Sequence, residues 1–584
     1  MRSRSVDKCR ILCYLLGEEA KKRNIVAAFL IWGDTMRKLI ALLVAVVALS
    51  AAVGAAQASA PEFSDLPDSG WAREAIVSAY EYGLMGGMDG GIFGVGRNMS
   101  RAEFVTVLVR MFGWDSAMGE DAFTDLGGSW ARENINTAAA NGVLDPGGAF
   151  QPDKSITRRE MAVMLVRALG YQGIAESAAD HAVPFTDVSA DRGYIVIAYD
   201  IGMINGTSAT TFSPETTATR EQAAAMLVRV YEKYTASTEW THAFYAISSY
   251  SQLELAKQFD AVSLGWSRMT LSAAEGAWLN TTSANGNEYC VPSGYEEAVT
   301  ALQNAGVKLH LSVYMDTSGS LAELLASETY RAQAIDAILD ELTRAYDQLG
   351  GNPYTGVTLD FEGLRAAQRR DYTQFLTELR ARLDQAGKTL YVTVMPATAD
   401  GVYYDGYDYR AIGDLADKVI LMAHDYNAKS LTGFLNSKYY MTTALTPIRS
   451  VYYSLRAVCD PDSGVQDRFK LVLAINCASL AWETDESGQL ISEDPVHPTT
   501  ATIYSRLTGG AEMGWSDTYR NPYLRYVTEE GRHVFLWYED SRSVGEKVEL
   551  ARLFGFNGVS IWRLGVIPHY PDAGLYYNVM DGIQ

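Results

Sequence analysis

The sequence predicts a multidomain protein. An α-helical triplet of repeats precedes an α/β region with the pattern of a (β/α)8 TIM barrel, which carries a small insertion between its strands 7 and 8. Three observations predict this architecture. The chain has 584 residues, more than one ordinary hydrophobic core holds. A motif recurs three times within the first 235 residues, and short apolar runs alternate with helical patterns from residue 240 onward.

Composition narrows the function classes. Hydrophobic residues make up 48% and charged residues 20% of the chain, which is typical of a folded protein. The net charge of −21 excludes nucleic acid as an expected partner, because phosphate binding needs a basic surface. The seven histidines lack ligand spacing, and no glycine-rich phosphate loop opens a helix. We therefore expect no metal and no other cofactor.

The N-terminal region predicts export. Met36-Arg-Lys precedes an apolar run from Leu39 to Leu49, and small residues then end at Ala58-Ser-Ala60, which is the pattern of a secretory signal peptide over 36–60. We expect Met36 to be the true start and residues 1–35 to be a gene-model artefact. The alternative is an N-terminal cytoplasmic tail with an uncleaved anchor. After signal cleavage, we expect a secreted protein without a stable membrane span.

Three repeats occupy residues 61–235, at about 61–115, 121–170 and 183–235. Each opens with Phe-Ser/Thr-Asp and later carries Ser/Thr-x-x-Glu/Gln ahead of an apolar run. That second pattern is a capping box, in which both side chains satisfy backbone N–H groups at a helix start. The three boxes predict three helix starts whose apolar runs share a core: Ser100–Glu103, Thr157–Glu160 and Thr219–Gln222.

These motifs resemble S-layer homology domains. In that family, three copies form a three-fold helical assembly that binds an anionic secondary polymer of the bacterial cell wall. The resemblance implies polymer binding by the arginine that follows each cap hydroxyl, namely Arg101, Arg158 and Arg220. The alternative is that these arginines only occupy solvated helix starts. Repeat three has Gly193-Tyr194 where the first two have Trp, so its site is expected to be weak or absent. Attachment to the cell wall or surface layer follows from the resemblance.

After a short linker, 236–241, residues 242–584 form the predicted barrel. Eight strands separated by helical segments favour a closed barrel, and an open doubly wound sheet is the alternative. The interval Leu480–Trp537 is expected to be the inserted subdomain. The predicted strands are His242–Ile247, Phe259–Trp266, Val307–Met315, Tyr354–Phe361, Leu390–Met395, Lys418–Ala423, Lys470–Cys477 and Gly558–Trp562.

The candidate catalytic residues lie where these strands end, because chemistry in such barrels gathers at the C-terminal face. Asp360 and Glu362 end the fourth strand and point to the same side. Two carboxylates this close favour protonation of one of them, which is what a general acid requires. The alternative is an exposed acidic pair on the surface.

This region resembles the family 18 glycoside hydrolases, in the branch of spore and cell-wall N-acetylglucosaminidases. The family pattern Asp-x-x-Asp-x-Asp-x-Glu reads Thr355-Gly-Val-Thr358-Leu-Asp360-Phe-Glu362, and Met422-Ala-His424-Asp425 matches the sixth strand. The resemblance implies a substrate-assisted retaining mechanism. It also implies that Glu362 is the acid, that Asp360 holds the substrate acetamide, and that Asp425 steadies it with His424 or Tyr426.

The remaining candidate site residues complete the prediction. Trp562 is expected to form the floor under the sugar, with plain core packing as the alternative, and Tyr314 ends the third strand. Thr358 replaces a motif acid. Its hydroxyl can still hydrogen-bond Asp360 but cannot share a full charge, which implies slower activity or a shifted pH optimum. The expected function is cleavage of β-1,4 bonds next to N-acetylglucosamine, with peptidoglycan favoured over chitin-like oligosaccharides. A non-catalytic glycan-binding protein and a structural surface-layer component are the alternatives.

Overall fold

The computed structural model describes residues 63–117, 119–246, 249–317, 320–398 and 405–583. The predicted signal peptide and the 35 residues before it lie outside these ranges. The chain divides into two compact units, Met1–Val95 and Gly96–Gln584. Within the described ranges, no helix is long and apolar enough to cross a membrane.

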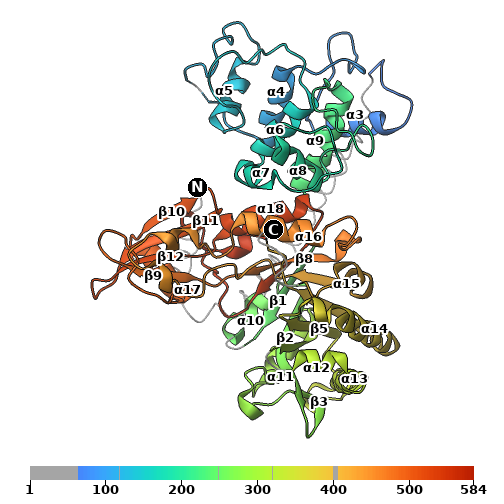
Figure 1. The fold of residues 1–584 in the computed structure, drawn as a ribbon, viewed down its shortest axis with the longest axis vertical. Helices are drawn as coiled ribbons and strands as arrows, with labels where there is room; N and C mark the ends of the chain where they lie inside the picture. Colours follow the sequence, from blue (N-terminus) through green and yellow to red (C-terminus); the bar gives the residue numbers. More distant parts are fainter. Residues whose placement is uncertain (1–62, 118, 247–248, 318–319, 399–404, 584) are drawn as a thin grey trace, which may run out of the picture. The chain divides into compact units, whose positions relative to one another are not determined.

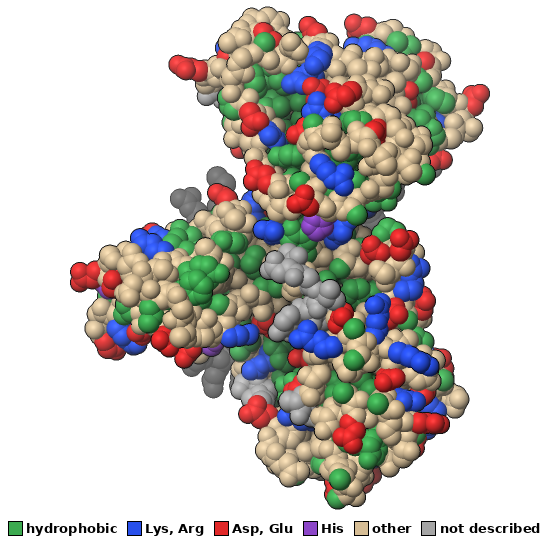
Figure 2. Space-filling model, in the orientation of Figure 1, with side chains coloured by type: hydrophobic (Ala, Val, Ile, Leu, Met, Phe, Trp, Pro, Cys, Tyr) green, Lys and Arg blue, Asp and Glu red, His purple; other side chains and the backbone are tan. Residues whose placement is uncertain are grey.

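On the face drawn in Figure 2, the acidic and basic side chains of the described residues are interspersed.

The aspartate of each repeat motif fastens a loop. In the first unit, which contains α3 (Trp71–Glu81), Asp65 accepts hydrogen bonds from three successive backbone N–H groups beginning at Phe93, at 2.7–2.8 Å. In the second unit, Asp125 and Asp187 accept two such bonds each, at 2.7–2.9 Å. The Phe-Ser/Thr-Asp motif is therefore a loop-closing device, repeated once in each copy.

The helices that follow the capping boxes begin where the sequence predicts. Ser100 and Thr157 each accept from the N–H three residues on, at 3.2 and 3.1 Å, and Gln222 accepts from the N–H of Thr219 at 3.3 Å. The cap segments also pair with one another in a closed cycle, because Asn98 bridges Thr219, Ser100 bridges Ser155 and Thr157 bridges Thr217. The helices of this region are α4 (Arg101–Phe112), α5 (Arg132–Ala140), α6 (Arg158–Ala168), α7 (Gln172–Ala178), α8 (Arg192–Asp200) and α9 (Arg220–Tyr234).

Eight parallel strands form a closed barrel, as predicted (Figure 1). The first strand pairs on one side with the second and on the other with the last, which excludes the open-sheet alternative. A short strand, β3 (Gly276–Asn280), adds an antiparallel hairpin to the second strand. The barrel strands are β1 (Trp240–Tyr245), β2 (Ala261–Ser272), β4 (Lys308–Asp316), β5 (Gly356–Glu362), β6 (Thr389–Val394), β7 (Lys418–Leu421), β8 (Leu471–Asn476) and β13 (Gly558–Trp562).

A separate antiparallel sheet lies in the sequence between β8 and β13. Its strands are β9 (Leu480–Thr484), β10 (Glu512–Ser516), β11 (Asn521–Val527) and β12 (His533–Trp537), with α17 (Thr500–Thr508) between the first two. Trp482 and Trp537 are fully buried in the core of this sheet. The barrel helices are α10 (Leu253–Ala256), α11 (Tyr295–Asn304), α12 (Leu321–Ala326), α13 (Glu328–Thr343), α14 (Arg369–Ala386), α15 (Tyr409–Leu415), α16 (Ile448–Val458) and α18 (Ser541–Leu553).

Candidate active site

The predicted acid pair lies at the C-terminal end of β5. The strand register aligns Asp360 with Tyr314 and Glu362 with Asp316 on the neighbouring strand β4. Alternate residues of a strand share a face, so Thr358, Asp360 and Glu362 point the same way, in order toward the mouth of the barrel. Asp360 is 4% exposed, and Glu362 is partly buried. These carboxyl groups are therefore part of the barrel and not a solvated surface pair.

Asp360 is held by a threonine from the next strand. The hydroxyl of Thr393 on β6 donates to Asp360 Oδ1 at 2.7 Å. Burial raises the pKa of Asp360 to about 6, while the Thr393 hydrogen bond and the nearby His424 act to lower it. Asp360 is thus fixed in orientation and keeps a negative charge above neutral pH.

Glu362 is the group prepared to carry a proton. Burial raises the pKa of Glu362 to about 8, and the negative charges of Asp360, Asp425 and Asp316 act in the same direction. Because the two carboxyl groups interact, the pair loses its protons in two steps, and each step is a property of both groups together. Near neutral pH the pair holds one proton, and Glu362 is the side that favours it.

Asp425 stays ionised in the segment that follows β7. Burial acts to raise the pKa of Asp425, but His424 and Asn476 lower it to about 2. His424 Nδ1 lies 3.0 Å from Oδ2, and the Asn476 side-chain amide donates to Oδ1 at 2.7 Å. Asp425 has a φ of 60°, in the left-handed region that a non-glycine residue seldom adopts. The charge of Asp425 raises the pKa of Glu362, so Asp425 belongs to the same site.

Of the other sequence-predicted residues, two lie at the mouth of the barrel and one contacts a surrounding helix. Tyr314 lies at the site, where its hydroxyl donates to Asp316 at 2.8 Å. Trp562 ends β13 and packs edge-on against Phe244 at 5.2 Å, at the base of the mouth. Tyr426 is different, because its hydroxyl lies 2.7 Å from the Ser454 hydroxyl on α16. Tyr426 therefore contacts the helix layer.

A buried neutral network lies beneath Asp360, where the family motif would place another acid. The hydroxyl of Thr358 contacts Ser263 at 2.6 Å and His310 Nδ1 at 3.3 Å, while His242 lies 2.7 Å from Ser263. The far ends of this network are Ser560 and Thr389, at 2.7 and 2.8 Å. Burial lowers the pKa of His310 to about 3 and that of His242 well below its usual range, so both rings are neutral.

This network corrects one expectation. Thr358 was expected to be able to hydrogen-bond Asp360, but the partner of Asp360 is Thr393. Sequence reasoning missed Thr393, Asn476 and the network histidines as site-supporting residues. The available signal was polar side chains inside or at the end of apolar strands, at positions that face the barrel interior. Across the described residues, no group of three or more His, Cys, Asp or Glu is placed to hold a metal ion.

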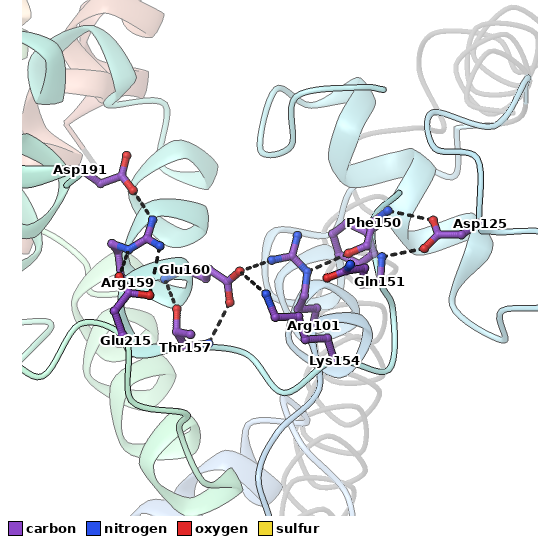
Figure 3. A network of polar contacts seen from close by, with 10 residues as sticks. All are labelled: Arg101, Asp125, Phe150, Gln151, Lys154, Thr157, Arg159, Glu160, Asp191 and Glu215. Carbon is purple, nitrogen blue, oxygen red and sulfur yellow. Dashed lines mark hydrogen bonds and ion pairs between the residues drawn. The ribbon is translucent and has the colours of Figure 1, made fainter. Parts of the chain in front are cut away.

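In the repeats, the predicted arginines bridge one copy to the next, and Figure 3 shows this arrangement for Arg101. Arg101 Nε donates to the carbonyl of Phe150 at 2.9 Å, its guanidinium lies 4.5 Å from the Phe150 ring centroid, and it forms an ion pair with Glu160 of the second capping box. Arg220 is 6% exposed and pairs with Glu103 of the first capping box at 3.4 Å. The solvated-helix-start interpretation is therefore wrong for Arg220.

Arg158 differs from these two arginines. It donates to the backbone carbonyls of Phe212 at 2.9 Å and Asn205 at 2.7 Å, and it lies 4.8 Å from the Phe212 ring centroid. The residue equivalent to Glu160 in the next repeat is Gln222, which carries no charge. For the arginine of repeat two, therefore, the capping-box residue that corresponds to the carboxylate partners of the other two arginines is uncharged, and the charge that acts on Arg158 is that of Asp187.

The fold and the site define a class of protein. A closed (β/α)8 barrel with two buried or partly buried carboxyl groups two residues apart at the C-terminal end of one strand is an arrangement suited to glycoside hydrolysis. The family model described as "Glycosyl hydrolases family 18" matches residues 216–566, and the chain belongs to that family. The model described as "S-layer homology domain" matches residues 62–105, 122–162 and 184–224, so the N-terminal region holds three such domains.

Several proteins are similar to this chain over part of its length. A cortical fragment-lytic enzyme of Bacillus subtilis (strain 168) is 26% identical over 300 residues, covering 50% of this chain and 64% of that protein. One of Bacillus anthracis is 24% identical over 213 residues, covering 36% and 46%. The matched region thus spans 64% and 46% of the length of these two relatives. The solved spore cortex-lytic enzyme SleL of Bacillus megaterium QM B1551 is 16% identical, with a TM-score of 0.45 and coverages of 67% and 82%.

Proposed function

We propose that this protein is a secreted, wall-attached glycoside hydrolase that cleaves β-1,4 bonds next to N-acetylglucosamine. Peptidoglycan is the favoured substrate and chitin-like oligosaccharides are next. The observation that carries the proposal is the pair formed by Glu362, whose pKa is raised to about 8, and Asp360, which is oriented by Thr393. A neutral carboxyl group that is available near pH 7 is the requirement for protonating a glycosidic oxygen.

The first step is substrate-assisted. Glu362 gives its proton to the glycosidic oxygen, and the bond from that oxygen to the anomeric carbon breaks. The carbonyl oxygen of the substrate's own N-acetyl group attacks the anomeric carbon, which forms an oxazolinium ion. Asp360, with Asp425 held by His424 and Asn476, stabilises the positive charge that develops on the acetamide.

The second step restores the enzyme. Glu362, now ionised, accepts a proton from water, and the oxygen of that water attacks the anomeric carbon from the face that the leaving group left. The oxazolinium ring opens and the product keeps its original anomeric configuration. Trp562 supplies the apolar base under the sugar ring, since an aromatic face packs on the C–H face of a sugar.

We further propose that the three repeats attach the protein to an anionic cell-wall polymer. Arg158 is the strongest candidate anion site, because the capping-box position that supplies a carboxylate partner to Arg101 and Arg220 is the uncharged Gln222 in its case. Arg101 and Arg220 already pair with Glu160 and Glu103. An arginine fork beside a helix start suits a carboxylate or phosphate ligand.

Incubation of the purified protein with peptidoglycan and with chitooligosaccharides tests the hydrolase. We expect reducing ends from wild type and a loss of at least about 100-fold in the Glu362→Gln variant, as for removal of a general acid. Wild type that releases none from either substrate contradicts the enzyme and favours a glycan-binding protein. A variant as active as wild type contradicts the assignment of Glu362.

A further inference from the structure

Arg268, an arginine that the proposed mechanism does not use, lies at the same end of the barrel as the catalytic carboxyl groups. It belongs to the part of β2 that extends past the neighbouring strand β1, and the strand register places it opposite Tyr314 of β4. Its guanidinium lies 5.0 Å from the Tyr314 ring centroid and 5.8 Å from that of Tyr289. Tyr314 is aligned with Asp360 across the β4–β5 register, so Arg268 is two strands from the acid pair.

The guanidinium is held in place mainly by aromatic faces. Tyr289 and Tyr314 stack with their ring centroids 4.8 Å apart, and Arg268 lies over both rings. Its ion-pair contact is from Nη2 to Asp316 Oδ2 at 3.3 Å. An arginine offers five N–H donors in a rigid planar fork. With one donor directed at Asp316 and 38% of its side chain exposed, Arg268 can present the rest of the fork to a ligand.

The chemistry at Glu362 gives no reason for a cation at this position. The charges that act most strongly on Glu362 are those of Asp360, Asp425 and Asp316, and all of them favour its protonated form. A cation would act in the opposite direction and weaken the proton's hold on the general acid. A neutral, chitin-like chain also offers no negative group for an arginine to bind. The position of Arg268 therefore indicates a substrate that carries an anion close to the reacting sugar.

We propose that Arg268 binds a carboxylate on the substituent of a sugar next to the scissile bond, and so selects acidic muramic-acid-type glycans over neutral chitin-like ones. This inference rests on the proposed hydrolase function and names its substrate class. The planar fork of Arg268 on its tyrosine platform matches a carboxylate in two parallel hydrogen bonds. The carboxylate has two possible sources, the free lactyl group at O3 or the peptide attached to that group.

The test compares three substrates of similar length. The first is a neutral chitooligosaccharide, the second is peptidoglycan glycan strands stripped of peptide, and the third is the same strands with peptide retained. The variants are Arg268→Gln, which removes the charge, and Arg268→Lys, which keeps the charge but not the fork. Arg382→Gln is the matched control, because Arg382 forms an exposed ion pair with Asp336 at 3.0 Å on the outer helix α14.

We expect Arg268→Gln to lower the ratio of kcat/KM on acidic strands to kcat/KM on the neutral oligosaccharide by at least about tenfold, as for loss of a charge-assisted hydrogen bond. Arg268→Lys should recover part of that ratio, and Arg382→Gln should leave it unchanged. A fall confined to stripped strands identifies the lactyl carboxylate, and a fall confined to peptide-bearing strands identifies the peptide. An unchanged ratio in Arg268→Gln overturns the proposal.

Binding measurements separate this proposal from the hydrolase itself. In the Glu362→Gln background, titration calorimetry with stripped strands should show an affinity that weakens with added salt, and Arg268→Gln should remove most of that salt dependence. Wild type that hydrolyses none of the three substrates refutes the hydrolase, while the binding comparison still decides the role of Arg268. Equal affinity for acidic and neutral strands in the Glu362→Gln protein refutes carboxylate recognition.

Discussion

Replacing Glu362 by Gln should remove activity and at the same time stabilise the folded protein. Burial and three neighbouring carboxylates raise the pKa of Glu362 from its ordinary 4.5 to about 8. The folded protein therefore holds a proton that the unfolded chain releases above pH 4.5. A group whose pKa is raised by folding favours the folded state fully when the pH is below its pKa in the unfolded chain. This contribution is lost as the pH rises toward its pKa in the folded protein. The wild-type protein thus carries a penalty that grows between pH 4.5 and pH 8.

The size of that penalty follows from the two pKa values. At pH 7 the unfolded carboxyl group is 2.5 pH units above its pKa of 4.5, while the folded one is still mostly protonated. At about 1.4 kcal/mol per unit, the wild-type protein is less stable by roughly 3 kcal/mol than it would be without the titration. The amide of Gln does not titrate, so Glu362→Gln should recover most of this free energy at pH 7 and almost none at pH 4.

Denaturant unfolding of wild type and variant at pH 4, 5.5 and 7 measures the effect. The matched control is Glu254→Gln, because Glu254 forms an exposed ion pair with Lys257 that contributes little to stability. The stability difference for Glu362→Gln should grow with pH, and the control should stay within a few tenths of a kcal/mol. A difference that is the same at pH 4 and pH 7, or a variant less stable than wild type at pH 7, would refute the account of Glu362 as a buried, protonated acid.

Three further outcomes test other parts of the structure. Asp360→Asn removes the group proposed to stabilise the acetamide, so activity should be at least about 100-fold lower. It also removes a charge that raises the pKa of Glu362, so the alkaline limb of the pH–activity profile should move to lower pH. An unmoved limb contradicts the electrostatic coupling of Asp360 and Glu362. Thr358→Asp adds a carboxylate to a fully buried neutral network. It should lower the free energy of unfolding by roughly 3 kcal/mol at pH 8 and by less at pH 5, where the new group is protonated. An equal loss at both pH values would contradict the description of this network as buried and neutral. Arg158→Ala should weaken binding of the full chain to purified cell wall by roughly tenfold, as for loss of a charged hydrogen bond. Arg101→Ala should weaken it less, and the reverse order in a sedimentation assay would contradict the choice of Arg158.

Local physics explains the features that the sequence predicted well. The capping boxes join residues only three apart, such as Ser100 and Glu103, so the helix start is specified within one turn. The barrel strands are apolar runs bounded by polar segments, and Asp360 and Glu362 lie two residues apart on one of them. Their shared face follows from strand geometry alone. The second strand was predicted too short. It continues to Ser272 through alternating polar and apolar residues, which pair with β3 and, at Ser267 and Arg268, also with β4.

The tertiary structure decided which partners each functional group meets. Asp360 bonds Thr393 and Asp425 bonds Asn476, and these pairs are 33 and 51 residues apart in the chain. No local pattern predicts such pairings, because they depend on which strands become neighbours when the barrel closes. The same closure surrounds Glu362 with carboxylates and removes water from it, and these two effects set its proton affinity. The sequence by itself therefore determined which residues could do the chemistry, while burial and long-range contacts decided their charge states and their orientation.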